Sequence, residues 1–130
     1  MIKIGQKQTA SKAWSNEDIE LFSLLSGDIN PIHLDDNFAK NTIFKKRIVH
    51  GFLVGSLISS VIGNHLPGVG TIYLYQDMKF INPVYIDEKI ICEVEVIEVV
   101  PEKSRAKLKT TCFKNEDNTI VIEGFALVKY

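Results

Sequence analysis

Hydrophobic positions in the first third of the chain recur with the period of a helix. An apolar stripe at roughly helical spacing runs through residues 15–25, and it consists of Ile19, Phe22, Leu24 and Leu25. Ser15 and Asp18 have the spacing of a capping box, with Asp in place of the usual Glu or Gln. We therefore predict a short amphipathic helix that ends at Gly27. A second short helix is predicted over 35–41, where acidic residues occupy the first turn.

Residues 50–66 form a longer apolar segment of a different kind. They are apolar on nearly every side, with glycines and serines at intervals. A helix that is apolar all round is a buried one, and its small residues let other elements pack closely against it. The segment is too short and too interrupted for a membrane span, which takes about 20 apolar residues. We predict a single buried central helix.

From residue 71 onward the period of the pattern changes to two. Apolar and polar positions alternate over residues 71–81, 89–99, 105–113 and 119–129, with turn-forming residues between these segments. Gln76 interrupts the apolar face of the first segment, and a further strand is predicted near 6–14. The pattern indicates an antiparallel sheet with one inward and one wetter face. We predict an α+β fold in which this sheet wraps around the 50–66 helix, as a single domain covering residues 1–130.

Length and composition are consistent with one soluble globular domain. The 130 residues suffice to bury a core, and 45% hydrophobic with 24% charged residues are ordinary values. A net charge of -1 gives no electrostatic footprint for nucleic acid. The first ten residues lack the apolar segment of a signal peptide. Cys92 and Cys112 lie in apolar runs without metal-type spacing, so we expect buried thiols, although a disulfide stays open. We expect a cytoplasmic protein with no nucleic-acid partner and no membrane segment.

The segment SGDINPIH, residues 26–33, holds a carboxylate and an imidazole five positions apart. On an ideal helix, the side chains of Asp28 and His33 would point about 140° apart. Pro31 also disfavours helical geometry at Asn30. We therefore expect an extended or turning loop that brings Asp28 and His33 to one point, with Asn30 fixing the loop by an Asx-type bond. The alternative, from these residues alone, is a helix-ending loop with an incidental histidine.

Residues 22–33, FSLLSGDINPIH, resemble the signature of the R-specific enoyl-CoA hydratases of the MaoC-like dehydratase family. The run IVHG, residues 48–51, resembles that family's second landmark. The resemblance covers Gly5 to Tyr130 and implies the hot-dog fold, a sheet wrapped around one long helix. It implies reversible syn hydration of a trans-2-enoyl-CoA to an (R)-3-hydroxyacyl-CoA, with no cofactor beyond the CoA of the substrate. It also implies a homodimer, sometimes assembled further, with a tunnel at or near the subunit interface.

Hydration of an enoyl thioester needs the groups that these positions offer. Asp28 can accept a proton from water, and His33 can hold the same water in line with the β-carbon. By resemblance, Gly51 at the start of the buried helix is the oxyanion donor, and its missing β-carbon would let a carbonyl approach closely. His50 is expected to hydrogen-bond the loop. The resemblance places a hydroxyl near the catalytic water at Ser59, for which a packing role is the alternative.

Several other interpretations of these residues stay open. Asp28, His33 and His50 could form a metal-binding set, but no second shell is recognisable, so we expect no metal. Within the same fold, an acyl-CoA thioesterase and an (R)-3-hydroxyacyl-[acyl carrier protein] dehydratase are the alternatives. A non-enzymatic acyl-CoA-binding protein would normally carry an extra effector domain.

Contacts with the substrate outside the motif are predicted from position. The basic run 45–47 either meets the phosphates of CoA or is a solvated loop. The tunnel floor is expected to combine the final strand with helix residues, namely Leu53, Leu57 and Val61. No insertion that could lengthen the tunnel is evident, which favours short or medium acyl chains.

Overall fold

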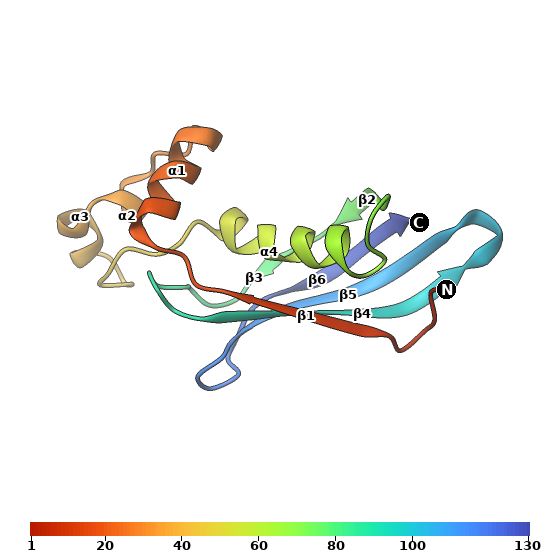
Figure 1. The fold of residues 1–130 in the computed structure, drawn as a ribbon. Coiled ribbons are helices and arrows are strands. Elements are labelled where there is room, and N and C mark those ends of the chain that lie inside the picture. Colours follow the sequence, from red (N-terminus) through yellow and green to blue (C-terminus); the bar gives the residue numbers. More distant parts are fainter.

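The computed structural model describes residues 1–130, and it consists of one antiparallel sheet that packs against one long helix (Figure 1). The strands are β1 (Lys7–Lys12), β2 (Ile72–Gln76), β3 (Lys79–Phe80), β4 (Ile90–Val100), β5 (Arg105–Lys114) and β6 (Ile120–Lys129). The helices are α1 (Asn16–Ser26), α2 (Pro31–Leu34), α3 (Asp36–Lys40) and α4 (Gly51–Asn64), with a 3-10 turn at Pro101–Lys103. Helix α4 lies along the sheet, and α1, α2 and α3 gather beyond its N-terminal end. The predicted α+β hot-dog architecture is confirmed.

The sheet has the strand order β1-β4-β5-β6-β2, and β3 also pairs with β6. The three long strands lie at its centre, where the alternation of the sequence is most regular. The segment 71–81, predicted as one strand, is instead divided into β2 and β3. Asp77 causes the division, because its carboxylate accepts a hydrogen bond from the backbone N–H of Phe125 at 2.9 Å. Only a glycine at position 124 leaves room for the Asp77 backbone at this point.

The core lies between α4 and the inner face of the sheet. It contains 21 buried residues, and those of α4 that face the sheet include Ile58 and Val61, both 0% exposed. Two glycines of α4 bring the helix close to the chain around β3. A β-carbon at Gly51 would lie 2.7 Å from the ring of Phe80, and one at Gly55 would lie 2.6 Å from the sulfur of Met78. The predicted close packing of small residues is confirmed at these two positions.

The other face of α4 is uncovered, which contradicts the prediction of a helix buried on every side. Besides Asn64 at the end of the helix, the exposed residues are Phe52, Ser56, Ser59, Ser60 and Gly63. They share one face, because their spacing follows the helical period. A single sheet can cover only one side of a helix, so the outer face stays open in one chain. No helix of this chain is long and apolar enough to span a membrane.

The first helix begins and ends as the sequence predicts. Oγ of Ser15 accepts the backbone N–H of Asp18 at 3.2 Å, and the carboxylate of Asp18 accepts the N–H of Ser15 at 3.0 Å. Gly27 ends the helix in a left-handed conformation, with φ of 80°. The expectation of a non-helical segment through residue 33 is wrong for α2. Pro31 occupies the first position of this short helix, where its missing N–H costs nothing.

Candidate active site

The loop between α1 and α2 is fixed by three successive bonds from backbone to side chain. The N–H of Asp28 donates to Oγ of Ser26 at 3.0 Å, and the N–H of Asn30 donates to Oδ1 of Asp28 at 3.1 Å. The N–H of Ile32 then donates to Oδ1 of Asn30 at 3.3 Å. This last contact caps α2 and is the Asx-type bond that the sequence predicts. The loop therefore holds Asp28 in a defined position before α2 begins.

His33 is presented by α2 and is 8% exposed. Its Nδ1 lies 2.7 Å from the backbone carbonyl oxygen of Ile48. A carbonyl can only accept, so Nδ1 carries the hydrogen. In a neutral ring, Nε2 is then left with a lone pair that can accept a hydrogen bond.

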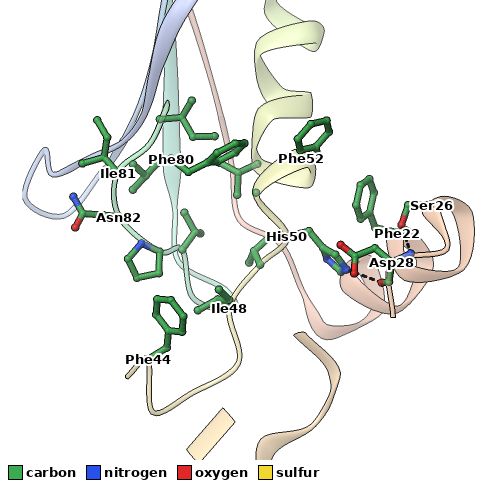
Figure 2. Close-up of a pocket in the computed structure, with 17 residues that line it drawn as sticks. Phe22, Ser26, Asp28, Phe44, Ile48, His50, Phe52, Phe80, Ile81 and Asn82 are labelled. Carbon is green, nitrogen blue, oxygen red and sulfur yellow. Dashed lines mark hydrogen bonds between the residues drawn. The ribbon is translucent and has the colours of Figure 1, made fainter. Parts of the chain in front are cut away.

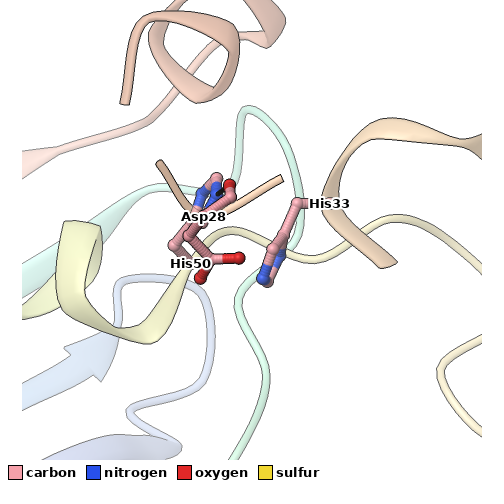
Figure 3. A group of neighbouring side chains, drawn as sticks. All are labelled: Asp28, His33 and His50. Carbon is pink, nitrogen blue, oxygen red and sulfur yellow. Dashed lines mark hydrogen bonds between the residues drawn. The ribbon is translucent and has the colours of Figure 1, made fainter. Parts of the chain in front are cut away.

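Asp28, His33 and His50 converge on one point, as Figure 3 shows. One oxygen or nitrogen atom from each lies within 4.8 Å of the corresponding atom of the others. The carboxylate belongs to an exposed residue, whereas both histidines are buried. The two acceptors of a single water that donates two hydrogen bonds lie about 4.6 Å apart. One water can therefore bridge Asp28 and His33. The predicted meeting of Asp28 and His33 is confirmed.

His50 directly precedes α4 and packs behind the loop. Its Nε2 lies 3.2 Å from the carbonyl oxygen of Asp28, so it bonds the loop as predicted. The same nitrogen lies 3.1 Å from Oγ of Ser23, a buried residue of α1 that sequence reasoning missed. A serine four positions after Ile19, within the apolar stripe, was the signal that could have identified it. Burial lowers the pKa of His50 below its ordinary value, which favours the neutral ring.

A largely apolar pocket of about 650 Å³ opens beside this cluster, and Asp28 and His50, but not His33, are among the residues that line it. Figure 2 shows it between Asp28 and Phe22 on one side and Ile81 and Asn82 on the other. Eleven of its 17 lining residues are hydrophobic, so an acyl chain could be buried there.

The floor of the pocket differs in part from the prediction. The final strand contributes Val121 and Ile122, as expected. Leu57 and Val61 lie instead in the core, and Leu53 also does not line the pocket. The pocket opens at the first turn of α4, and Leu57 and Val61 follow farther along the helix. Leu53 belongs to that first turn but lines a second, smaller pocket together with Trp14 and Phe22.

The start of α4 faces the pocket with free backbone donors. His50 precedes the helix but makes no side-chain cap, and both Gly51 and Phe52 line the pocket. Their N–H groups therefore point out of the helix N-terminus without a capping partner. The expectation that a substrate carbonyl can approach closely at the missing β-carbon of Gly51 is wrong, because the ring of Phe80 fills that space. Any oxyanion role of Gly51 must therefore rest on its N–H.

Ser59 is not brought together with the other predicted site residues. It lies eight positions after Gly51, which corresponds to about 12 Å along the helix. Its position on the exposed face of α4 leaves it outside the residues that line the pocket. Within one chain, Ser59 therefore has no contact with the Asp28–His33 pair.

Arg47 has a structural role that the basic run did not reveal. Its Nε donates to Oδ1 of Asp36 at 2.8 Å, and its Nη1 donates to Oδ1 of Asn16 at 2.8 Å. Nη1 also lies 3.4 Å from the carbonyl oxygen of His33. Arg47 thus links α1, α2 and α3, and it is not a free cation beside the pocket.

Metal binding and thiol chemistry would each need residues that this chain holds in a particular arrangement. Asp28 and His33 could offer ligands to a cation, but Nε2 of His50 is already bonded and its Nδ1 is buried without a partner. Cys92 and Cys112 face each other across β4 and β5 as buried free thiols. A hydrogen bond between them, together with burial, raises the pKa of Cys92, so a reactive thiolate is disfavoured.

Known proteins resemble this chain over nearly its whole length. Residues 2–119 match the family model of the MaoC like domain. An (R)-specific enoyl-CoA hydratase from Rhodospirillum rubrum is 44% identical, over 98% of this chain and 87% of that protein. The solved structure of an (R)-hydratase from A. caviae involved in PHA biosynthesis matches with a TM-score of 0.95 at 40% identity, over 98% of this chain and 96% of that one. A mitochondrial 3-hydroxyacyl-[acyl-carrier-protein] dehydratase from Arabidopsis thaliana is 36% identical, over 97% of this chain and 76% of that protein. This chain belongs to the MaoC-like domain family.

Proposed function

We propose that this protein is an (R)-specific enoyl-CoA hydratase. It adds water reversibly and with syn geometry to a short- or medium-chain trans-2-enoyl-CoA, and it forms an (R)-3-hydroxyacyl-CoA. The observation that supports this most directly is the meeting of His33 with Asp28, which lines an apolar pocket of about 650 Å³. The likeness to an (R)-specific hydratase over 98% of the chain supports the same reaction.

Asp28 and His33 act together on one water molecule. The carboxylate of Asp28 and the Nε2 lone pair of His33 both accept, so the water donates one hydrogen to each. This leaves an oxygen lone pair of the water to attack the β-carbon. Asp28 takes the proton as the new C–O bond forms, a type of transfer that contributes on the order of 10²–10⁴-fold.

The same proton can then return to the α-carbon. Because Asp28 lies on the side from which the water attacks, the proton and the hydroxyl reach the same face of the double bond. This accounts for the syn geometry of the proposed reaction. Dehydration follows the same steps in reverse, with Asp28 removing the α-proton.

Negative charge develops on the thioester oxygen during the addition. The N–H groups of Gly51 and Phe52 at the start of α4 can donate to that oxygen. Such donors are effective because they are already oriented before the substrate arrives. We assign Gly51 as the principal oxyanion donor through its N–H.

The proposed reaction needs no metal and no cofactor beyond the CoA of the substrate. Water, base and oxyanion donors all come from this chain's own residues and from solvent. Dialysis against EDTA should therefore leave the hydration rate unchanged. A loss of activity that Zn²⁺ restores would instead support a metal at Asp28 and His33.

Carrier specificity is the main alternative within this chemistry. Dehydration of an (R)-3-hydroxyacyl group on acyl carrier protein would use the same residues, and the likeness to the plant dehydratase makes it the second candidate. We propose CoA as the carrier, with Lys45 and Lys46 as its phosphate contacts. The ammonium of Lys46 lies 4.8 Å from the ring centre of Tyr85, near the pocket residue Phe44. Replacing both lysines with Gln should raise KM for a CoA ester and leave kcat unchanged.

We propose that the protein is a cytoplasmic homodimer. Strand β2 lies at the edge of the sheet and exposes Ile72 (55%) and Leu74 (45%). Two further apolar side chains, Phe52 of α4 and Phe80 of β3, are also exposed, at 68% and 50%. An unpaired strand edge with such side chains is typical of an interface. Two buried free thiols agree with a reducing compartment.

The test is to mix the purified protein with crotonyl-CoA and follow the absorbance of the conjugated enoyl thioester. We expect rapid loss of absorbance without release of free thiol, and chiral analysis should give the R alcohol. Release of thiol would identify a thioesterase instead. Activity with crotonyl-acyl carrier protein alone would favour the dehydratase, and binding without turnover of either ester would favour a non-enzymatic protein.

A further inference from the structure

Two buried polar side chains meet behind the loop that carries Asp28. Ser23 faces inward from α1 and is 4% exposed, and His50 directly precedes α4 and is 1% exposed. Nε2 of His50 lies 3.1 Å from Oγ of Ser23 and 3.2 Å from the carbonyl oxygen of Asp28. A polar group that is buried without a partner is costly, so this contact ties α1, the loop and the start of α4 together.

The partners of His50 determine where its hydrogen lies. The carbonyl oxygen of Asp28 can only accept, so Nε2 must carry the hydrogen, and Oγ of Ser23 is a second acceptor for it. Nδ1 is then unprotonated, which fits its burial without any partner. A hydrogen on Nδ1 would be a buried donor with no acceptor. Neither nitrogen is therefore free to exchange a proton with a substrate.

The ring of His50 also supports the ring of His33. The two ring centres lie 3.9 Å apart with an angle of 26° between their planes. The ring centre of Phe22 lies 4.8 Å from that of His50 in a T-shaped arrangement. His33 is thus held at Nδ1 by the carbonyl of Ile48 and on one face by His50. One side chain, His50, contacts both the backbone of Asp28 and the ring of His33.

We propose that His50 and Ser23 are positioning residues that set the distance between Asp28 and His33. His50 fixes both members of the pair at once, and Ser23 keeps the Nε2–H of His50 directed at the loop. Neither residue transfers a proton to or from the substrate. This inference rests on the proposed hydration reaction, in which one water must contact Asp28 and His33 together. A misplacement of about 1 Å in such an arrangement can cost about 100-fold in rate.

Three variants separate positioning from proton transfer. His50→Gln keeps an N–H donor near the position of Nε2 but cannot titrate, and His50→Phe keeps a ring but loses the donor. Ser23→Ala removes the second acceptor, with Ser11→Ala on the exposed strand β1 as its matched control. Hydration of crotonyl-CoA is measured for each, with kcat and KM determined separately.

We expect the losses to fall on kcat, with KM little changed. His50→Phe should lose about 100-fold, His50→Gln should stay within about tenfold of wild type, and Ser23→Ala should lose about fivefold. Ser11→Ala should equal wild type. If His50→Gln loses as much as Asp28→Asn, His50 transfers a proton and the proposal is wrong. Unchanged kcat in folded His50→Phe would also overturn it, because His50 would then be only a packing residue.

Nitrogen NMR of the imidazole rings gives a readout that does not need activity. The chain has three histidines, so the signals of His33 and His50 can be assigned with one variant each. At about pH 7 we expect a neutral Nε2–H tautomer for His50, and for His33 we expect a hydrogen on Nδ1. An Nδ1–H or charged His50 would overturn the proposal. If wild type is inactive on crotonyl-CoA but the tautomers are as expected, the proposed function fails while the arrangement of His50 stands.

Discussion

The ring of Phe80 occupies the space that a side chain at position 51 would need. We predict that Gly51→Ala lowers the free energy of unfolding by about 1–3 kcal/mol, as expected for overpacking. The same substitution should cost much less when Phe80 is already Ala, because the clashing atoms are then gone. Urea unfolding of the four proteins in this cycle measures the coupling. An equal cost in both backgrounds would mean that Phe80 is not the constraint.

Burial of His50 makes stability depend on pH. Its pKa lies below the ordinary value of 6.5 in the folded chain, so only the unfolded chain takes up the proton as the pH falls below that value. We predict that wild type loses stability more steeply than His50→Gln between about pH 7 and about pH 5. Urea unfolding at several pH values measures the two slopes. Parallel slopes would show that His50 titrates normally in the folded state.

At the scale of single residues, the sequence predicts contacts between neighbours along the chain and misses contacts between distant positions. Asp28, Asn30 and His33 lie within six residues, so turn chemistry alone predicts that the loop brings the carboxylate and imidazole together. The contact of Ser23 with His50 spans 27 positions and depends on how α1 approaches the start of α4. The packing of Phe80 against Gly51 depends likewise on β3, which the pattern did not separate from β2.

At the scale of elements, Arg47 holds the three short helices together. Its guanidinium group bonds Asp36 and Asn16, and its side chain is only 15% exposed. We predict that Arg47→Gln lowers the free energy of unfolding by about 1.5–3 kcal/mol, the range for hydrogen bonds to charged groups. Lys7→Gln is the control, because Lys7 forms only an exposed 3.9 Å ion pair with Glu93. Chemical unfolding of both variants tests this, and equal small losses would contradict the role of Arg47.

The elements themselves were predictable where their signals are local. The capping box at Ser15 and the glycine at position 27 mark both ends of α1 in the sequence, and the structure confirms them. The short helix α2 is not evident from the sequence, because Pro31 disfavours helical geometry at Asn30 but suits the first position of a helix that begins at Pro31 itself. The division of β2 from β3 was missed because it depends on a bond from Asp77 to the distant strand β6.

At the scale of the whole molecule, the exposed apolar side chains around β2 favour a dimer. Light scattering on the purified protein should give about twice the 14.7 kDa of one chain. Replacing Leu74, which is 45% exposed on the edge strand, with Lys should shift the mass toward that of one chain. A monomeric wild type would contradict the proposed interface, and a dimeric Leu74→Lys variant would place it elsewhere.

The overall architecture was predictable because it follows from two periods in the sequence. Alternation from residue 71 onward predicts the sheet, and the apolar segment 50–66 predicts its central helix. The exposure of the outer face of α4 was not predictable, since its serines and its glycine are equally typical of small residues that let other elements pack closely in a core. The location of the pocket at the first turn of α4 likewise depends on tertiary packing.

The central claim is that Asp28 and His33 activate a water for addition to an enoyl thioester. The most direct measurement is kcat for hydration of crotonyl-CoA by Asp28→Asn, whose amide oxygen can still accept the N–H of Asn30 and preserve the loop. Asp117→Asn in the β5–β6 turn is the matched control. We predict that Asp28→Asn loses on the order of 10²–10⁴-fold in kcat while remaining folded, and that the control equals wild type. Wild-type turnover by a folded Asp28→Asn protein would contradict the claim.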